Sequence, residues 1–249
     1  MKTTAFHLQK GGVGKTSMSA AIAYELSKRG RTIVVDIDPQ GNASSWLAKG
    51  TPKHELADVL FGKVKAGEAV MPTAAPDLDI LPTFGLEGTL KVYGENQLAN
   101  EPYIFEDLTE ELSRLGYEFA VFDLSPGFGR LERAALIAAS EVITPAAPDY
   151  FSLDGLEIFD SELAKLTKAM RKGPNHLRVI CNAYDGRIEQ HKDIYQQMSF
   201  IKQYQVYRVP VDPAFRKAQA LHVPLQALAD HQAAKKETLE TIAKIGVLI

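Results

Sequence analysis

Residues 4–30 read TAFHLQKGGVGKTSMSAAIAYELSKRG: a strand-like run, a glycine-rich segment and a helical pattern in succession. The run TAFHL is β-rich, KGGVGKTS occupies residues 10–17, and the residues that follow have helical periodicity. A strand that leads through a glycine loop into a helix is the context that a phosphate-binding loop requires. We therefore predict that Gly11, Gly12, Val13 and Gly14 present backbone N–H groups to an anion at the helix N-terminus.

The polar residues of this loop suit a nucleotide and its metal ion. We expect Lys15 to bridge the β- and γ-phosphates, and Ser17 to complete the loop beside it. Thr16, at the head of the helix, can place its hydroxyl on Mg²⁺, which keeps most of its waters and takes few protein ligands. The loop thus predicts ATP and Mg²⁺ as cofactors.

Short β-rich runs recur along the chain, and most are followed by longer helical patterns. Runs such as TIVVD and FAVFD lack polar alternation, as expected for strands that are covered on both faces. We predict an α/β fold: a mostly parallel twisted sheet with helices on both faces and ligands at the carboxyl ends of its strands. The further strands are expected in 32–36, 78–82, 119–123, 141–145 and 177–182, and the helices in 16–29, 130–139, 153–171 and 187–203.

Composition places few limits on this reading. A chain of 249 residues with 45% hydrophobic residues can form one large domain, and no linker or repeat divides it, so residues 1–249 are interpreted as a single domain. The only cysteine, Cys181, excludes an intrachain disulfide. No signal-peptide pattern and no run of about 20 apolar residues is present, so a cytoplasmic protein is expected.

A second lysine, Lys10, stands where an ordinary Walker A loop begins with glycine. The pattern KGGVGKTS resembles the deviant Walker A motif of the ParA/MinD family of P-loop ATPases, and the resemblance covers nearly the whole chain. It implies an ATPase that forms a homodimer on binding ATP, in which Lys10 acts in trans on the partner's phosphates. An activating partner protein, ParB-like or other, is also implied.

Two aspartate motifs strengthen the resemblance. The segment VDIDPQGN resembles the family's switch I, which implies that Asp38 orients the attacking water near the metal, while Asp36 supports the metal or the loop. FAVFD has the Walker B shape, so Asp123 is expected to hold Mg²⁺ directly or through water. The next residues read LSPG from Leu124 to Gly127, whereas the family commonly reads DCPPS from the aspartate onward. This departure leaves the hydrolysis rate open.

Later segments resemble the family less closely. EVITPAAPDYFSLDGL, residues 141–156, resembles a loop and helix start along the family's dimer face. Asn182 resembles the asparagine that reads adenine, although an asparagine in a turn is an equal alternative. Pro210 matches the family's turn near the C-terminus and is included among the nucleotide-binding candidates.

The charge distribution points to an anionic partner. Residues 160–249 carry 14 Lys and Arg against 9 Asp and Glu, although the whole chain has a net charge of −3. Within this part, VPVDPAFRKAQALHVP resembles the stretch in which DNA-binding members of the family carry an arginine after a turn, and the resemblance matches at Pro210 and Arg216. It implies that Arg216 and Lys217 contact DNA, and Arg208 in the same basic part could extend the contact; solvated surface charges are the alternative. Such contacts would be independent of base sequence and would place the protein on the nucleoid.

Three other functions remain open. A MinD-like protein would end in a membrane helix. One helical face near the C-terminus is apolar, with Leu239, Ile242, Ile245 and Ile249. This segment lacks the basic face of an interfacial helix, so we expect it to pack on the core. A metabolic enzyme on this fold has no reason to carry DPQGN, and an iron–sulfur member needs paired cysteines. A nucleotide-locked scaffold is the third alternative. The cargo, whether plasmid, chromosome or protein cluster, is left open.

Overall fold

One eight-stranded sheet runs through the whole molecule. The computed structural model describes residues 1–249 except 86–87, 99–100, 230 and 232. The strand order is β3-β4-β2-β5-β1-β6-β7-β8, and every neighbouring pair is parallel except β3 with β4 at one edge. The strands are β1 Lys2–Phe6, β2 Thr32–Ile37, β3 Met71–Pro72, β4 Leu78–Leu81, β5 Phe119–Leu124, β6 Glu141–Ala146, β7 Asn175–Tyr184 and β8 Gln205–Pro210.

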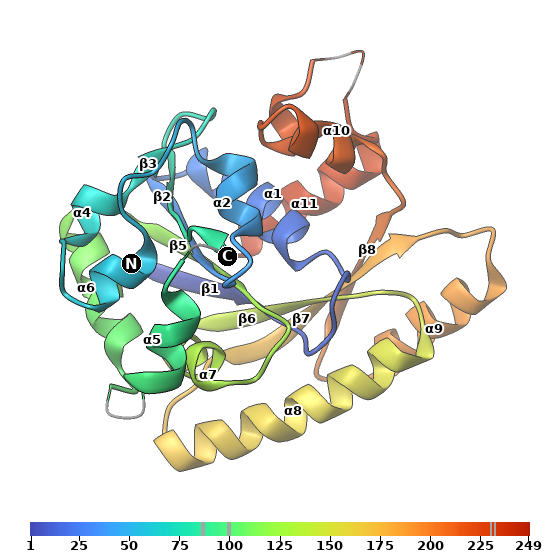
Figure 1. Cartoon of the computed structure of the whole chain (residues 1–249). Coiled ribbons are helices and arrows are strands. Elements are labelled where there is room, and N and C mark those ends of the chain that lie inside the picture. The colour runs from blue at the N-terminus through green and yellow to red at the C-terminus, as the bar shows by residue number, and fades with distance from the viewer. Residues whose placement is uncertain (86–87, 99–100, 230, 232) are drawn as a thin grey trace.

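Helices cover both faces of this sheet (Figure 1). One layer holds α1, α2, α10 and α11, and the other holds α3 to α9. The α/β fold that the sequence predicts is therefore confirmed. The helices are α1 Lys15–Ser27, α2 Asn42–Leu47, α3 Leu56–Leu60, α4 Ala66–Ala69, α5 Leu90–Asn96, α6 Ile104–Arg114, α7 Arg130–Ala138, α8 Tyr150–Met170, α9 Glu189–Phe200, α10 Ala214–Ala220 and α11 Lys236–Leu248, with a 3₁₀ turn, η2, at Leu225–Ala227.

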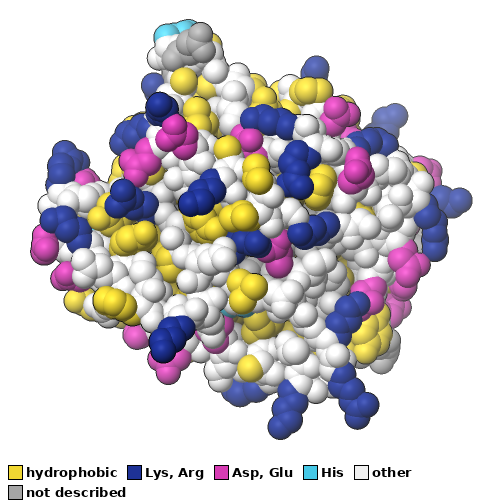
Figure 2. Space-filling model, turned by 180° about the vertical axis from the view of Figure 1, so that it is seen from behind, with side chains coloured by type: hydrophobic (Ala, Val, Ile, Leu, Met, Phe, Trp, Pro, Cys, Tyr) yellow, Lys and Arg dark blue, Asp and Glu magenta, His cyan; other side chains and the backbone are white. Residues whose placement is uncertain are grey.

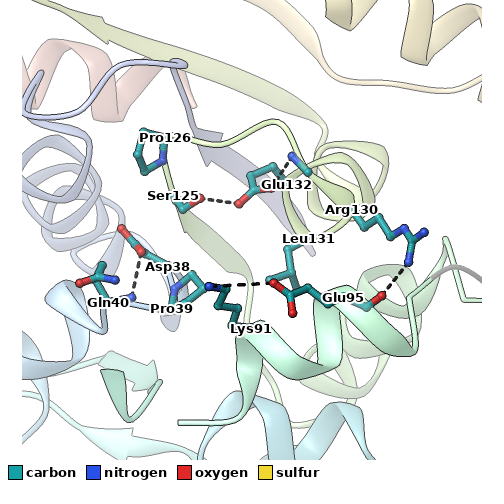
Figure 3. Close-up of a pocket in the computed structure, with 12 residues that line it drawn as sticks. Asp38, Pro39, Gln40, Lys91, Glu95, Ser125, Pro126, Arg130, Leu131 and Glu132 are labelled. Atoms are coloured by element: carbon teal, nitrogen blue, oxygen red, sulfur yellow. Dashed lines mark hydrogen bonds and ion pairs between the residues drawn. The ribbon is translucent and has the colours of Figure 1, made fainter. Parts of the chain in front are cut away.

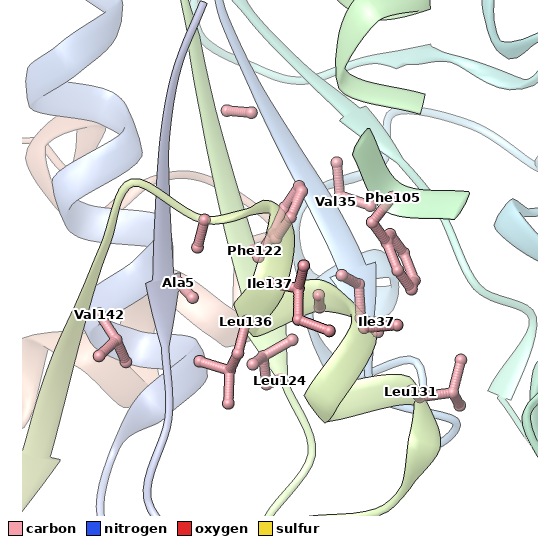
Figure 4. Packing of buried hydrophobic residues seen from close by; sticks show 14 of the residues in the cluster. Ala5, Val35, Ile37, Phe105, Phe122, Leu124, Leu131, Leu136, Ile137 and Val142 are labelled. Carbon is pink, nitrogen blue, oxygen red and sulfur yellow. The ribbon is translucent and has the colours of Figure 1, made fainter. Parts of the chain in front are cut away.

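A hydrophobic core fills the space on each side of the sheet. Every residue of β2 is buried, as are all residues of β5 except Phe119, which explains why these runs lack polar alternation. Alternate residues of a strand serve opposite layers: Val34 packs toward α1, whereas Val35 packs toward α6 and α7 (Figure 4). This two-sided burial holds the central strands rigidly beneath the loops at their carboxyl ends.

Each predicted strand and helix is present in the structure, with ends that differ by a few residues, and the structure adds elements that were not predicted, among them the helices α5, α6 and α10. The edge strands β3 and β8 were not predicted, because β3 has two residues and β8 mixes polar with apolar side chains and is mostly half-buried or exposed. Helix α8 begins at Tyr150, three residues before the predicted start. Its N-cap is Asp149, whose carboxylate accepts a hydrogen bond of 2.8 Å from the Ser152 N–H.

The C-terminal helix α11 packs on α1, as expected for a core helix. Ile242 and Ile245 are fully buried, and a Cβ on Gly246 would lie 2.7 Å from Glu25 Cβ, so the two helices approach closely. Arg29 Nη1 also donates a hydrogen bond of 2.6 Å to the Gly246 carbonyl oxygen. Among the described residues, no helix combines the length and the apolar character needed to cross a bilayer.

Candidate nucleotide site

The glycine loop joins β1 to α1 at the centre of the sheet. Gly12 and Gly14 have φ angles of 72° and 94°, in the left-handed region that glycine adopts without strain. A Cβ on Gly14 would lie 2.2 Å from Asn182 Nδ2, which donates a hydrogen bond of 2.9 Å to the Val13 carbonyl oxygen. Because the first N–H groups of a helix have no helical partner, the loop and α1 together form an anion cradle.

Lys15 lies inside this cradle, and its exposed fraction is 7%. Its Nζ donates hydrogen bonds to the carbonyl oxygens of Lys10 at 2.8 Å and Leu8 at 3.3 Å. Burial lowers the pKa of Lys15, while the carboxylates of Asp123, Asp38 and Glu132 oppose that shift. The ammonium is thus held among the loop's own carbonyl groups, at the place where a phosphate chain needs a cation.

Asp123 supplies a buried carboxylate beside the loop. It lies in register with Phe6 of β1 on one side and with Asp36 of β2 on the other. Burial raises the pKa of Asp123, and the hydroxyls of Thr16 and Ser19 oppose this; yet among the described residues neither carboxylate oxygen makes a hydrogen bond within normal limits. A buried carboxylate needs a compensating group. The donor set therefore fits Mg²⁺, which Asp123 and Thr16 would hold.

Asp36 and Asp38 have different environments. Asp36 Oδ2 accepts hydrogen bonds from Ser44 N at 2.7 Å and from Ser44 Oγ at 2.6 Å, while its Oδ1 accepts one from Asp38 N at 3.2 Å. Burial raises the pKa of Asp36, and the Asp123 carboxylate raises it further. Asp36 therefore stabilises the loop after β2 through these hydrogen bonds. Asp38, by contrast, borders the space next to the cradle, and its Oδ1 accepts a hydrogen bond of 2.9 Å from Gln40 N.

Lys10 points away from its own cradle. Its Nζ contacts both carboxylate oxygens of Asp149 at 2.7 Å and Ser152 Oγ at 3.2 Å, at the start of α8. The ring of Phe151 lies 5.8 Å from the same ammonium and is 78% exposed. The ammonium groups of Lys10 and Lys15 thus have different partners: Asp149 and Ser152 for Lys10, and the loop carbonyl groups for Lys15.

Two further nucleotide-binding candidates, Asn182 and Pro210, lie on the neighbouring strands β7 and β8. Asn182 on β7 contacts the glycine loop through Val13. A register shift follows at Ala183, whose φ is 57°, and Pro210 of β8 then pairs with Tyr184. Pro210 lines a separate cavity of about 760 Å³ together with Arg208.

Two adjoining cavities open over the carboxyl ends of the central strands. The first, of about 620 Å³, is lined by the glycine loop and by Thr16, Ser17, Asp38 and Pro126. The second, of about 590 Å³, shares Asp38 and Pro126 with the first and extends toward Ser125 and Glu132 (Figure 3). A nucleotide on the glycine loop therefore has a second space beside its phosphate end.

Sequence reasoning missed several residues of these cavities. Glu132 belongs to the first turn of α7, and nothing in a helical pattern distinguishes a carboxylate that turns back toward a site. Gln219 and His222 line the nucleotide cavity from the region of α10, 202 and 205 residues after Ser17 at the end of the glycine loop. No local signal could have placed them there.

The three candidates for DNA contacts differ in whether their charges are already paired with an acidic side chain. Arg216 and Lys217 are exposed on α10, and within the described part of the chain neither forms an ion pair. Arg208 instead pairs with Glu237 at 3.4 Å and lies over the rings of Tyr184 and Tyr195. Figure 2 shows Lys and Arg side chains spread over the rear face and interspersed with acidic ones. The Lys and Arg side chains drawn in Figure 2 therefore form no continuous patch on that face.

A strand, a glycine loop with a buried lysine, and a buried carboxylate from the adjacent strand define a P-loop nucleotide-binding protein. A family model described as an AAA domain matches residues 1–176. The chain also shares 30% identity over 192 residues with the chromosome partitioning protein ParA of Caulobacter vibrioides, covering 75% of this chain and 71% of that protein. The chain belongs to the ParA/Soj/MinD family of P-loop ATPases.

Other similar proteins span almost the whole chain. An uncharacterized protein of Borreliella burgdorferi, BBD21, is 36% identical over 248 residues, which cover 99% of this chain and 98% of that protein. Among solved structures, apo McdA from Cyanothece has a TM-score of 0.84 at 20% identity and covers 99% of both chains. An ATP complex of a McdA variant has the same TM-score and identity, covering 100% of this chain and 97% of the other. At this identity the two structures establish the fold alone.

Proposed function

We propose that this chain is an ATP-driven switch that segregates or positions a large cargo. ATP and Mg²⁺ occupy the glycine loop, two chains pair around the nucleotide, and the dimer binds DNA without base specificity. Slow hydrolysis, stimulated by a ParB-like or other partner, returns the chain to a monomer. Strands from both ends of the chain share one sheet, which supports treating residues 1–249 as one ATPase domain.

The observation that carries this proposal is the position of Lys10. Its ammonium lies beside Asp149 and Ser152, outside its own phosphate cradle, while Lys15 alone fills that cradle. An ammonium at the rim is placed to reach a nucleotide on a second chain. The exposed rings of Tyr150 and Phe151 beside it, 54% and 78% accessible, provide apolar surface for a partner to cover.

Turnover in this scheme depends on Asp38 and Asp123. Phosphoryl transfer passes through a loose transition state, so the protein mainly positions groups and neutralises charge. Mg²⁺ supplies most of that charge when it is bound. Asp123 and Thr16 would hold the ion, Lys15 would neutralise the phosphate oxygens, and Asp38 would orient water from the adjoining cavity.

DNA binding is assigned to Arg216 and Lys217, because they are exposed and available on α10. Arg208 has a lesser part, since Glu237 offsets its charge. Each chain offers few cations, so dimerisation doubles the phosphate contacts and steepens the salt dependence of binding. Cytoplasmic protein would then associate with the nucleoid only in the ATP state.

The test measures binding to non-specific DNA and to liposomes, with ADP and with a non-hydrolysable ATP analogue. We expect DNA binding with the analogue alone. Arg216→Glu should weaken binding to all DNA sequences while leaving dimerisation intact. Arg114→Glu is the matched control, because Arg114 is exposed on α6, on the opposite face of the sheet.

Four results would contradict the scheme or parts of it. DNA affinity that is unchanged by Arg216→Glu across a salt titration removes this residue from the interface. Equal DNA binding with ADP and with the analogue refutes the switch. Nucleotide-dependent binding to liposomes instead of DNA favours the MinD-like alternative, and single-turnover assays without any hydrolysis favour a nucleotide-locked scaffold.

A further inference from the structure

The loop after β5 contains a hydrogen-bonded pair that the roles described above do not use. Ser125 Oγ donates to Glu132 Oε1 at 2.5 Å and accepts a hydrogen bond from Gly127 N at 3.2 Å. The exposed fraction of Glu132 is only 5%. Its other oxygen, Oε2, accepts from Gly129 N at 2.8 Å, so Glu132 also caps the first turn of α7.

This pair borders the same cavity as Asp38. The cavity of about 590 Å³ is lined by Asp38 and also by Ser125, Pro126 and Glu132 (Figure 3). Glu132 also lies within electrostatic range of Lys15, whose charged form it favours. A buried carboxylate that served only as a helix cap would have no reason to lie near Lys15, the lysine expected to contact the phosphates.

The direction of the hydrogen bond decides what Ser125 can do. An ionised carboxylate can only accept hydrogen bonds, so the single hydroxyl hydrogen of Ser125 is the one that makes the hydrogen bond to Glu132. The Ser125 oxygen can then only accept from any further neighbour. A water beside it must donate a proton toward Ser125, which turns the water's lone pair elsewhere.

We propose that Ser125 and Glu132 are a second water-orienting unit for ATP hydrolysis, acting together with Asp38. Ser125 accepts a hydrogen bond from the attacking water, and Glu132 is a positioning residue that fixes the direction of the Ser125 hydroxyl. The inference rests on the proposed ATPase function. In the step itself, the water oxygen bonds to the γ-phosphorus, the bond to the ADP oxygen breaks, and the displaced proton leaves with the product phosphate.

The test uses substitutions that change either the direction of the hydrogen bond between Ser125 and Glu132 or the Ser125 hydroxyl alone. Ser125→Ala removes the acceptor but leaves the cap of α7 in place. Glu132→Gln can keep the cap through its amide oxygen, while its NH₂ group donates to Ser125 and reverses the bond. Ser125→Thr retains the hydroxyl. Ser199→Ala and Glu110→Gln are matched controls on the exposed surfaces of α9 and α6.

We expect kcat for ATP to fall on the order of tenfold or more in Ser125→Ala and Glu132→Gln. The affinity for a non-hydrolysable analogue and ATP-dependent dimerisation should stay at wild-type values. The double variant should be no slower than either single variant, because the two residues act as one unit. Ser125→Thr should restore most of the rate.

Wild-type turnover in Ser125→Ala would overturn the inference. Loss of analogue binding in parallel with kcat would also overturn it, since that pattern belongs to a purely structural role. Additive losses in the double variant would contradict the shared unit. Absence of hydrolysis by the wild-type protein, with analogue binding intact, would instead refute the proposed ATPase itself, and this inference with it.

Discussion

Replacing Gly14 with alanine tests how the glycine loop is held. An alanine at φ 94° is strained by about 1–2 kcal/mol. Its Cβ would also lie 2.2 Å from Asn182 Nδ2, so the amide must swing away and lose its hydrogen bond to Val13, at a cost of about 1 kcal/mol. The free energy of unfolding should therefore fall by about 2–3 kcal/mol, and the thermal midpoint by about 4–12 °C.

The assay compares calorimetric midpoints and ATP affinities of Gly14→Ala and a matched control, Gly62→Ala. Gly62 has a similar φ of 68°, and a Cβ there would meet no described atom within 4 Å. The control should suffer only the strain, about 1–2 kcal/mol, and keep its ATP affinity. Gly14→Ala should lose ATP affinity at least about tenfold, because its loop N–H groups no longer converge. Equal stability and ATP affinity in the two variants would refute this account of the loop.

Three further predictions concern single side chains. Lys15→Ala should abolish ATP binding, measured by calorimetry, because no other side-chain cation lies in the described cradle; wild-type affinity would refute the site. Asp38→Ala should bind ATP, stop turnover and accumulate as a dimer in gel filtration; a monomer with ATP would refute the switch. Burial disfavours charge on Asp160, but hydrogen bonds from His176 and Tyr204 outweigh it and hold its pKa below the usual range. Asp160→Asn should therefore cost about 1–2 kcal/mol in urea unfolding at neutral pH, with the difference from wild type shrinking as pH falls through that lowered pKa; a difference that does not shrink with falling pH would contradict this.

The parts of the site that could be predicted are contiguous in sequence. The glycine loop, Lys15 and Thr16 sit between a strand and a helix, and the two aspartate segments each follow an apolar run. Strand periodicity also predicted that β2 and β5 are buried on both faces. Their pairing, which places Asp36 in register with Asp123, follows from the strand order and not from either run alone.

Other features could not be inferred from local patterns. Lys10 could be interpreted as a trans-acting lysine only through resemblance, whereas its contact with Asp149 joins residues 139 positions apart. Asn182 could be proposed as an adenine contact or as a turn residue, yet in the folded chain it closes over Gly14. The contact between Ser125 and Glu132 depends on how the chain turns between β5 and α7.

The amino-acid sequence by itself determined the class of fold and the identity of the phosphate-binding loop, because both depend on hydrophobic periodicity and on glycines that permit left-handed backbone angles. Only the tertiary structure decided which carboxylates are buried without partners, which cations are free, and which side chains share a cavity. Burial and charge pairing depend on every element packed around a residue. In this protein those elements come from strands and helices that are far apart along the chain.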